Sequence, residues 1–460
     1  MGRKPAEGDP FERAIRQYEA GDLKSALSLF REAAKRDASD PVIDAWIGYV
    51  LLRRGQPAAA MAPLRRATEL SPRSTEAHNN LGNAYLAMGD LKSAEAEYRL
   101  ASELAPRAPE AFFNRGHLAM RRKKWPAAVQ AFSAALERAP GDAAAENDLG
   151  YSLEQAGRLE ESIVHYRRAA AIRPSDAGYV RNLGLALRRA GNGAEAIVAL
   201  RRAAALRPGD AAVQLALGDL LAAGEQEDAA IASFRAAARA NPDSFAARYN
   251  LGVLLARKGA LAEAAAELGR AVVLRPRDAS SLAARGWVEH QQGRLGDAER
   301  SLSSALRLDP AAVGTRMNLA LTLRREGKRE AATEQWQAVL KAAPDNDEAR
   351  SLLAAALLER GHYVEATAAY GEIARRHPGD ADAWNNLGYA REKLGRLGPA
   401  IAAYEKAVAA NPRLTLALNN LGAAYERQGD QGKALDAYRR ALSADPKFAD
   451  ARRNVDRLTR

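Results

Sequence analysis

The 460-residue sequence contains no cysteine, so disulfide bonds, zinc–thiolate sites and cysteine nucleophiles are excluded. No apolar run approaches the roughly 18 residues that a membrane span needs. The first ten residues, MGRKPAEGDP, include basic side chains but lack the apolar segment of a secretory signal. We therefore expect a cytoplasmic protein without membrane insertion.

Sequence motifs for catalysis are missing as well. The six histidines show no H-E-x-x-H spacing, Gly191-Asn192-Gly193 lacks the third glycine of a dinucleotide loop, and Gly432-Lys433 lacks the upstream glycine of a phosphate loop. We therefore expect no enzymatic activity, no metal site and no cofactor.

The charge is moderately one-sided, at +11 over 460 residues. This excess permits an acidic partner or nucleic acid. Heavy use of arginine and alanine as helix formers is the simpler explanation, and this composition is typical of bacterial sequences.

Proline is present in a strict pattern: twelve of the twenty prolines recur every 34 residues, from Pro72 to Pro446. A fixed period of this length indicates a stacked repeat array. With each phased proline at repeat position 32, thirteen units cover residues 7–448. Their starts are residues 7, 41, 75, 109, 143, 177, 211, 245, 279, 313, 347, 381 and 415. We expect residues 1–6 to be disordered and residues 449–460 to form a capping helix with a polar outer face.

Each unit predicts a helix, a glycine turn and a second helix. Position 8 is glycine in ten units and position 24 is always bulky, which predicts close helix contact and a continuous core. The units that start at 313 and 347 have Ala320 and Ala354 at position 8, with Val339 and Ile373 at the usually small position 27. We expect wider helix spacing in these two.

The stretch WNNLGYA at Trp384–Ala390, followed by Ala400, Tyr404, Ala407 and Pro412, resembles the motif of the tetratricopeptide repeat (TPR) family. The resemblance extends over residues 7–448. It implies an all-α, right-handed TPR superhelix, an α-solenoid of helix–turn–helix repeats whose first helices line a concave groove. It also implies a scaffold or adaptor that binds other proteins or peptides.

The sixth position, which faces the groove in this family, is asparagine in seven units. A carboxamide has one acceptor and two donors and so pairs with any peptide backbone. The pattern resembles the asparagine ladder of the O-linked N-acetylglucosamine transferase repeats, without their catalytic domain. A packing or solubility role for the consensus N-L-G explains it as well. The residues are Asn80, Asn114, Asn182, Asn250, Asn318, Asn386 and Asn420.

Arginine and aromatic residues, the typical anchors of protein interfaces, share this predicted face. Asparagine and arginine recur together with a 68-residue period, which is either functional spacing or a trace of duplication. Aromatics alternating with arginine also suit single-stranded RNA. The candidates are Trp46, Tyr49, Phe113, Tyr151, Tyr249, Trp287 and Tyr389, with Arg188, Arg257 and Arg324.

The leading hypothesis is therefore a non-enzymatic protein-binding scaffold whose groove holds extended or helical segments. The alternatives are a nucleic-acid-binding solenoid and a regulatory TPR module of a transferase. The sequence leaves the partner, the pathway and the oligomeric state open.

The diluted charge yields a first prediction. RNA retention should be weak and non-specific, and should vanish near physiological salt through counterion release. Filter binding of single-stranded RNA across a salt series tests this. Nanomolar RNA affinity at about 150 mM salt would reverse the ranking of protein over nucleic acid.

Overall fold

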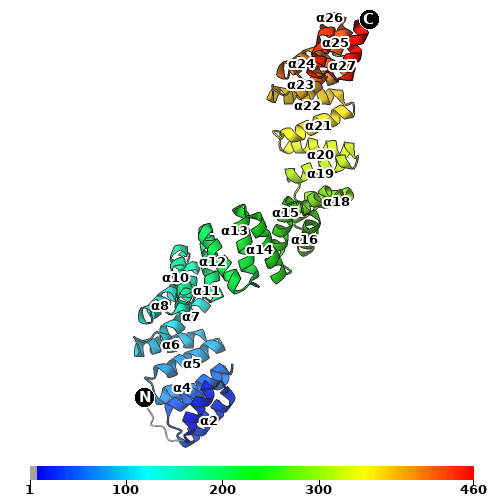
Figure 1. Ribbon diagram of the computed structural model, residues 1–460. Coiled ribbons are helices and arrows are strands. Elements are labelled where there is room, and N and C mark those ends of the chain that lie inside the picture. The colour runs from blue at the N-terminus through cyan, green and yellow to red at the C-terminus, as the bar shows by residue number, and fades with distance from the viewer. Residues whose placement is uncertain (1–7) are drawn as a thin grey trace. The chain divides into compact units, whose positions relative to one another are not determined.

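The computed structural model describes residues 8–460 (Figure 1). Residues 1–7, which include the predicted disordered segment 1–6, lie outside this range. Residues 8–460 form twenty-seven α-helices and no strand, which confirms the predicted all-α repeat architecture. The helices group into two compact units, which meet in sequence between Pro242 and Asp243.

The first unit contains α1 to α14. Their bounds are α1 (Pro10–Glu19), α2 (Leu23–Arg36), α3 (Pro41–Arg53), α4 (Pro57–Leu70), α5 (Thr75–Met88), α6 (Leu91–Leu104), α7 (Glu110–Arg121), α8 (Trp125–Arg138), α9 (Ala143–Gln155), α10 (Leu159–Ile172), α11 (Ala177–Arg189), α12 (Gly193–Leu206), α13 (Ala211–Ala223) and α14 (Glu227–Ala240).

The second unit contains α15 to α27. Their bounds are α15 (Phe245–Arg257), α16 (Leu261–Leu274), α17 (Ala279–Gln291), α18 (Leu295–Leu308), α19 (Val313–Arg325), α20 (Arg329–Ala342), α21 (Asp347–Glu359), α22 (Tyr363–Arg376), α23 (Ala381–Lys393), α24 (Leu397–Ala410), α25 (Thr415–Gln428), α26 (Gln431–Ala444) and α27 (Ala449–Leu458). In both units each odd-numbered helix of a repeat packs against the even-numbered helix that follows it.

Local signals set the helix ends. At the start of α11, the Asp176 side chain accepts a hydrogen bond from the Gly178 backbone at 2.8 Å, which satisfies one of the free N–H groups of the first turn. The turn inside each repeat needs a left-handed residue, usually glycine, as at Gly89 (φ 84°). Lys123 (φ 54°) and Glu225 (φ 58°) adopt the same conformation without being glycine. The packed helices therefore impose the turn even where the residue disfavours it.

Small residues on the first helix let the second helix come close. A Cβ atom added to Gly218 would lie 2.6 Å from Cδ1 of Phe234, and one added to Gly388 would lie 2.6 Å from Cδ1 of Tyr404. Phe234 is 1% exposed and Tyr404 is fully buried. Each glycine therefore makes the room that a large core side chain occupies.

The pair α21–α22, which carries Ala354 in place of glycine, packs less extensively than the other pairs within a repeat, which is the direction expected for wider spacing. The pair α19–α20, which carries Ala320, packs about as extensively as α7–α8, which keeps Gly116.

The backbone carbonyls of the prolines that recur every 34 residues accept hydrogen bonds. The Trp384 Nε1–H donates to the Pro378 carbonyl at 3.0 Å, and Arg316 Nη2 donates to the Pro310 carbonyl at 2.8 Å. In both cases the donor is the fourth residue of the following repeat. This bond ties the exit loop to the next first helix and satisfies a carbonyl that the loop would otherwise leave open.

Buried charges have hydrogen-bonded partners on the same or the neighbouring helix. The Asp44 carboxylate, 3% exposed, accepts from Arg66 Nε at 2.6 Å and Nη2 at 2.9 Å. The Glu289 carboxylate, 1% exposed, accepts from Ser301 Oγ at 2.7 Å and Arg285 Nε at 2.8 Å. Loss of one partner would leave the other charge buried and unpaired, which is strongly destabilising.

The Gly218 contact generates the second prediction. Gly218→Leu should overpack α13 against α14 and cost about 1–3 kcal/mol or more. The loosening should be local, because each repeat contacts only its neighbours. Hydrogen exchange of the full chain should show lost protection around α13 and α14, with distant repeats still protected.

Gly269→Leu in α16 is the matched control. A Cβ atom at Gly269 meets nothing within 4 Å, and leucine is the better helix former. It should leave exchange unchanged or slightly slower. Uniform loss of protection along the whole chain in Gly218→Leu would contradict the nearest-neighbour view.

Candidate functional site

All seventeen candidate residues lie on odd-numbered helices, the first helices of their repeats. We call the surface of these helices the first-helix face. The seven asparagines are half-buried there. Several consecutive first helices contact each other directly, such as α9 and α11 in the first unit or α15, α17 and α19 in the second.

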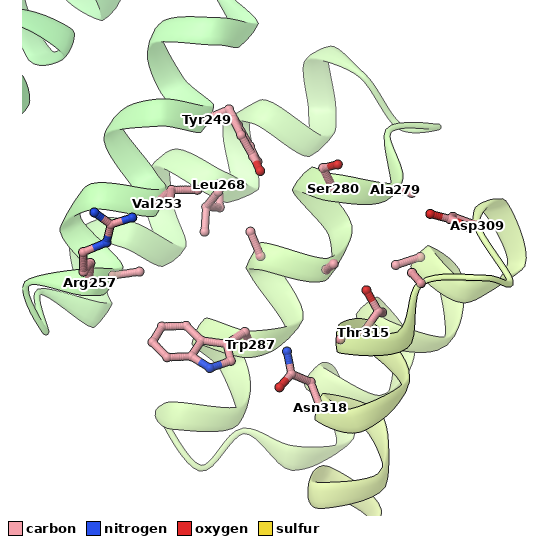
Figure 2. Close-up of a pocket in the computed structure, with 16 residues that line it drawn as sticks. Tyr249, Val253, Arg257, Leu268, Ala279, Ser280, Trp287, Asp309, Thr315 and Asn318 are labelled. Atoms are coloured by element: carbon pink, nitrogen blue, oxygen red, sulfur yellow. The ribbon is translucent and has the colours of Figure 1, made fainter. Parts of the chain in front are cut away.

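One cavity on this face brings four of the candidates together. It measures about 570 Å³ and is formed by α15, α17 and α19 of the second unit, with residues of α16 and α18 behind them (Figure 2). The candidates that line it are Tyr249, Arg257, Trp287 and Asn318. The remaining thirteen do not line it.

The cavity exists because the middle helix carries small side chains. Ala283 and Ala284 stand at repeat positions 5 and 6 of α17, where other repeats often carry larger residues. Tyr249 of α15 and Trp287 of α17 border the space that they leave (Figure 2). Two alanines between two aromatic rings therefore hollow out the face.

Five polar groups of this cavity have no partners within the described chain. The hydroxyls of Tyr249, Ser280 and Thr315, the Trp287 indole N–H and the Asn318 carboxamide make no hydrogen bond to any residue of 8–460. Burial, and secondarily the charge of Asp278, raise the pKa of Tyr249, so its hydroxyl stays protonated at neutral pH. The cavity thus offers both donors and acceptors to a ligand.

Other asparagines of the first-helix face are used within the fold. Asn182 Nδ2 donates to Asn147 Oδ1 at 2.8 Å, and Asn420 Nδ2 donates to Asn385 Oδ1 at 3.0 Å. In each bond the sixth residue of one repeat reaches the fifth residue of the repeat before. Asn114 bonds to Asn79 in the same way at 3.3 Å.

Asn318 has no such partner, because the corresponding fifth position is Ala283. Sequence reasoning missed these bridges. The signal was available in the asparagines that recur at position 5, next to the predicted ladder.

The candidate arginines lie in different surroundings. Arg188 Nη1 lies 3.1 Å from Asp219 Oδ2 in the first unit, and Arg324 Nη2 lies 3.3 Å from Glu359 Oε1 in the second. Both therefore bind to the neighbouring first helix. Arg257 is exposed and borders the cavity.

Aromatic candidates outside the cavity take part in packing. Trp46 stacks on Phe30 with ring centres 5.5 Å apart, and the Tyr49 hydroxyl lies 3.0 Å from that of Tyr18. These contacts join the first two repeats.

Further along the chain, the ring centres of Phe113 and Phe132 lie 6.5 Å apart. Tyr151 and Tyr389 remain exposed, at 38% and 37%. Lys393 Nζ lies 5.2 Å from the ring centre of Tyr389.

The described residues contain neither a group of side chains placed to bind a metal ion nor a helix that could span a membrane. Within 8–460, no group of three or more histidine, aspartate or glutamate side chains is placed to hold a metal ion. No helix in that range combines the length and apolar character that crossing a bilayer requires.

Family models match nearly the whole array. Models described as tetratricopeptide repeat match residues 79–143, 113–177, 181–240, 215–281, 263–313 and 356–415, as well as 415–448 and 289–356. A model described as TPR repeat matches residues 48–89. No curated protein matches the chain.

Solved structures resemble parts or all of the chain. YrrB, titled a TPR protein with an unusual peptide-binding site, is 22% identical and covers 40% of this chain and 95% of its own, with a TM-score of 0.38. PilF of Pseudomonas aeruginosa is 21% identical and covers 46% of this chain and 97% of its own, with a TM-score of 0.41.

The Cut9–Hcn1 hetero-tetramer of APC/C gives a match that is 14% identical and covers 97% and 95% of the two chains, with a TM-score of 0.35. Structural similarities with TM-scores this low do not indicate a function for this chain.

The asparagine bridges generate the third prediction. Asn182→Ala deletes a donor to Asn147 and should cost about 0.5–1.5 kcal/mol, partly offset by the better helix propensity of alanine. Asn318→Ala deletes no hydrogen bond and should leave stability unchanged or slightly higher. Urea unfolding followed by circular dichroism, with local hydrogen exchange, compares them. Equal stability of the two variants would show that the bridges contribute nothing.

Proposed function

Because the chain belongs to the tetratricopeptide repeat family, whose repeats generally serve as non-catalytic protein-interaction scaffolds, we propose that it binds a segment of a partner protein on its first-helix face. In this proposal the chain has no catalytic role of its own. The partner segment lies across α15, α17 and α19 in an extended conformation. Tyr249, Trp287 and Asn318 are its principal contacts.

The observation that carries the proposal is the cavity with its unpaired polar groups. Polar groups that already have partners, such as Asn182 with Asn147, gain little from a ligand. Tyr249, Trp287, Thr315 and Asn318 have only water to bond in the free chain, so a ligand with peptide groups replaces water without breaking an internal bond.

The dimensions of the site suit a short peptide. Neighbouring helices lie about 8–10 Å apart, so three consecutive first helices span about 20 Å. An extended chain crosses that distance with about six residues. A segment of this length can place one side chain in the cavity while its backbone passes Asn318.

The first-helix face is less suited to binding nucleic acid than to binding a peptide. The candidate arginines Arg188 and Arg324 are already paired with Asp219 and Glu359. A phosphate backbone would have to compete with these carboxylates for the guanidinium groups. This favours peptide over RNA as the ligand.

The fourth prediction tests this proposal on the full-length protein. Selection from a random dodecapeptide phage library should enrich peptides that bind saturably, with Kd values in the micromolar range by fluorescence anisotropy. Trp287→Ala should weaken the selected peptides about tenfold or more, because it removes an aromatic wall. Helical circular dichroism of this variant confirms that the fold is intact.

Val273→Ala is the control. Val273 is 78% exposed on the second helix α16 and does not line the cavity, so this variant should bind as the original protein does. Failure to enrich any peptide, or equal weakening by both variants, would contradict binding on the first-helix face.

A further inference from the structure

The cavity between α15, α17 and α19 has a mostly apolar lining. The small side chains of Ala283 and Ala284 and the fully buried Leu268 belong to it, and the rings of Tyr249 and Trp287 border the space (Figure 2). Displacement of water from such a lining by an apolar group is favourable. The cavity therefore suits a ligand side chain that is itself largely apolar.

Five uncharged polar groups also line the cavity, and they come from all three helices. None of them makes a hydrogen bond to a residue of 8–460. A side chain that is apolar in its body and polar at its tip satisfies both parts of this lining, and tyrosine and tryptophan have that character. The five groups are the Tyr249 hydroxyl on α15, the Ser280 hydroxyl and the Trp287 indole N–H on α17, and the Thr315 hydroxyl and the Asn318 carboxamide on α19 (Figure 2).

The two charged residues of the lining, Arg257 and Asp309, have opposite signs. Arg257 takes part in another interaction within the chain, and Asp309 accepts a hydrogen bond from the Ala311 backbone N–H at 3.1 Å. The lining therefore has no net formal charge with which to select a cation or an anion. A charged side chain in this apolar space would lose hydration that the cavity does not replace, so an uncharged side chain is favoured.

One aromatic wall of the cavity is fixed before any ligand arrives. The Tyr249 ring stacks on Phe245 with ring centres 5.8 Å apart and planes 8° apart. The Phe245 ring is itself held, because the guanidinium carbon of Arg275 lies 4.3 Å from its centre. An ordered wall loses little conformational entropy on binding. Because pairs of aromatic rings attract each other beyond the area that they bury, such a wall favours an aromatic ligand side chain over an aliphatic one.

We infer that the cavity is a subsite for one uncharged aromatic side chain of the bound segment, with tyrosine or tryptophan preferred to phenylalanine. This inference rests on the proposed function and names the residue that the site selects. The ligand ring lies between Tyr249 and Trp287, over the two small residues of α17. Its O–H or N–H bonds to one of the unpaired groups of the lining, which phenylalanine cannot do.

Asn318 completes the site by holding the backbone. Its carboxamide stands beside Trp287 and makes no hydrogen bond to a described residue (Figure 2). It can therefore donate to and accept from the peptide group of the residue whose side chain fills the cavity. This bond carries no sequence preference, so the selectivity comes from the aromatic rings and the other unpaired groups.

The fifth prediction concerns the peptides selected from the random dodecapeptide phage library, after removal of those that bind the support without protein. They should share one aromatic residue, with no charged residue at a constant distance from it. This readout needs no variant. Enriched peptides without a shared aromatic residue would overturn the inference while the scaffold function stands. Failure to enrich any peptide would overturn the proposed function itself.

Substitutions in a selected peptide test the same inference on the unaltered full-length protein. Leucine in place of the shared aromatic residue should weaken binding about twofold to tenfold, because the ring pairing is lost. Glutamate or lysine there should weaken it more, by about tenfold or more, because the charge is desolvated. A leucine peptide that binds as tightly as the aromatic one would overturn the aromatic preference.

A substitution in the protein tests whether the ring enters this cavity. Ala284→Leu fills the space and should weaken a selected peptide about tenfold or more. The chain already carries leucine at the same repeat position, at Leu352, so the fold should tolerate it. Ala266→Leu makes the same change on an exposed residue of α16 outside the lining and should leave affinity unchanged. Equal affinities of the two variants, both folded by circular dichroism, would overturn the inference.

A matched pair of asparagines tests the backbone contact. Asn318→Ala should weaken the peptide about threefold to tenfold. Asn80→Ala changes an asparagine at the same repeat position of the first unit, which likewise makes no hydrogen bond to a described residue, and should have no effect. Equal effects of Asn80→Ala and Asn318→Ala would overturn the cavity as the site.

Discussion

The close approach of the two helices within each repeat is the constraint on which the rest of the structure depends. It requires a glycine or alanine on the first helix and a bulky side chain opposite, as Gly218 and Phe234 illustrate. Because the packed residues occupy only part of the first helix, the remaining positions are free to vary. The first-helix face is therefore a regular support on which individual side chains differ from repeat to repeat.

Contacts between repeats use a different chemistry. Asparagine pairs such as Asn182 with Asn147, ion pairs such as Arg188 with Asp219, and proline carbonyls that accept from Trp384 or Arg316 join one repeat to the next. Polar bonds at these places are specific in register, whereas apolar contact alone tolerates sliding. Where the small residues of α17 interrupt this polar bonding, the cavity opens and polar groups are left for a ligand.

The fold could be predicted almost completely because its causes are periodic. The proline period and the small residue at position 8 recur in the sequence itself, so no knowledge of distant contacts is needed. Even the left-handed Lys123 and Glu225 stand at the repeat position that is glycine in the other units, so the period rather than the residue type marks them. The candidate site was harder to predict, because the bridges that engage Asn114, Asn182 and Asn420 depend on an asparagine 35 positions earlier in the sequence. Asn182 meets Asn147 there, whereas Asn318 meets Ala283, and only the structure makes that difference evident.

The hydrogen bond from the fourth residue of a repeat to the preceding proline carbonyl has a consequence for how such a chain can change length. The bond in Pro378–Trp384 spans six residues and holds the loop against the next helix. One inserted or deleted residue in this loop would break the bond and disturb the packing of the helix that follows. Insertion of a complete unit would preserve both. Genetic duplication or loss of whole repeats is therefore the tolerated route to a longer or shorter array, whereas single-residue insertions and deletions in these loops are not.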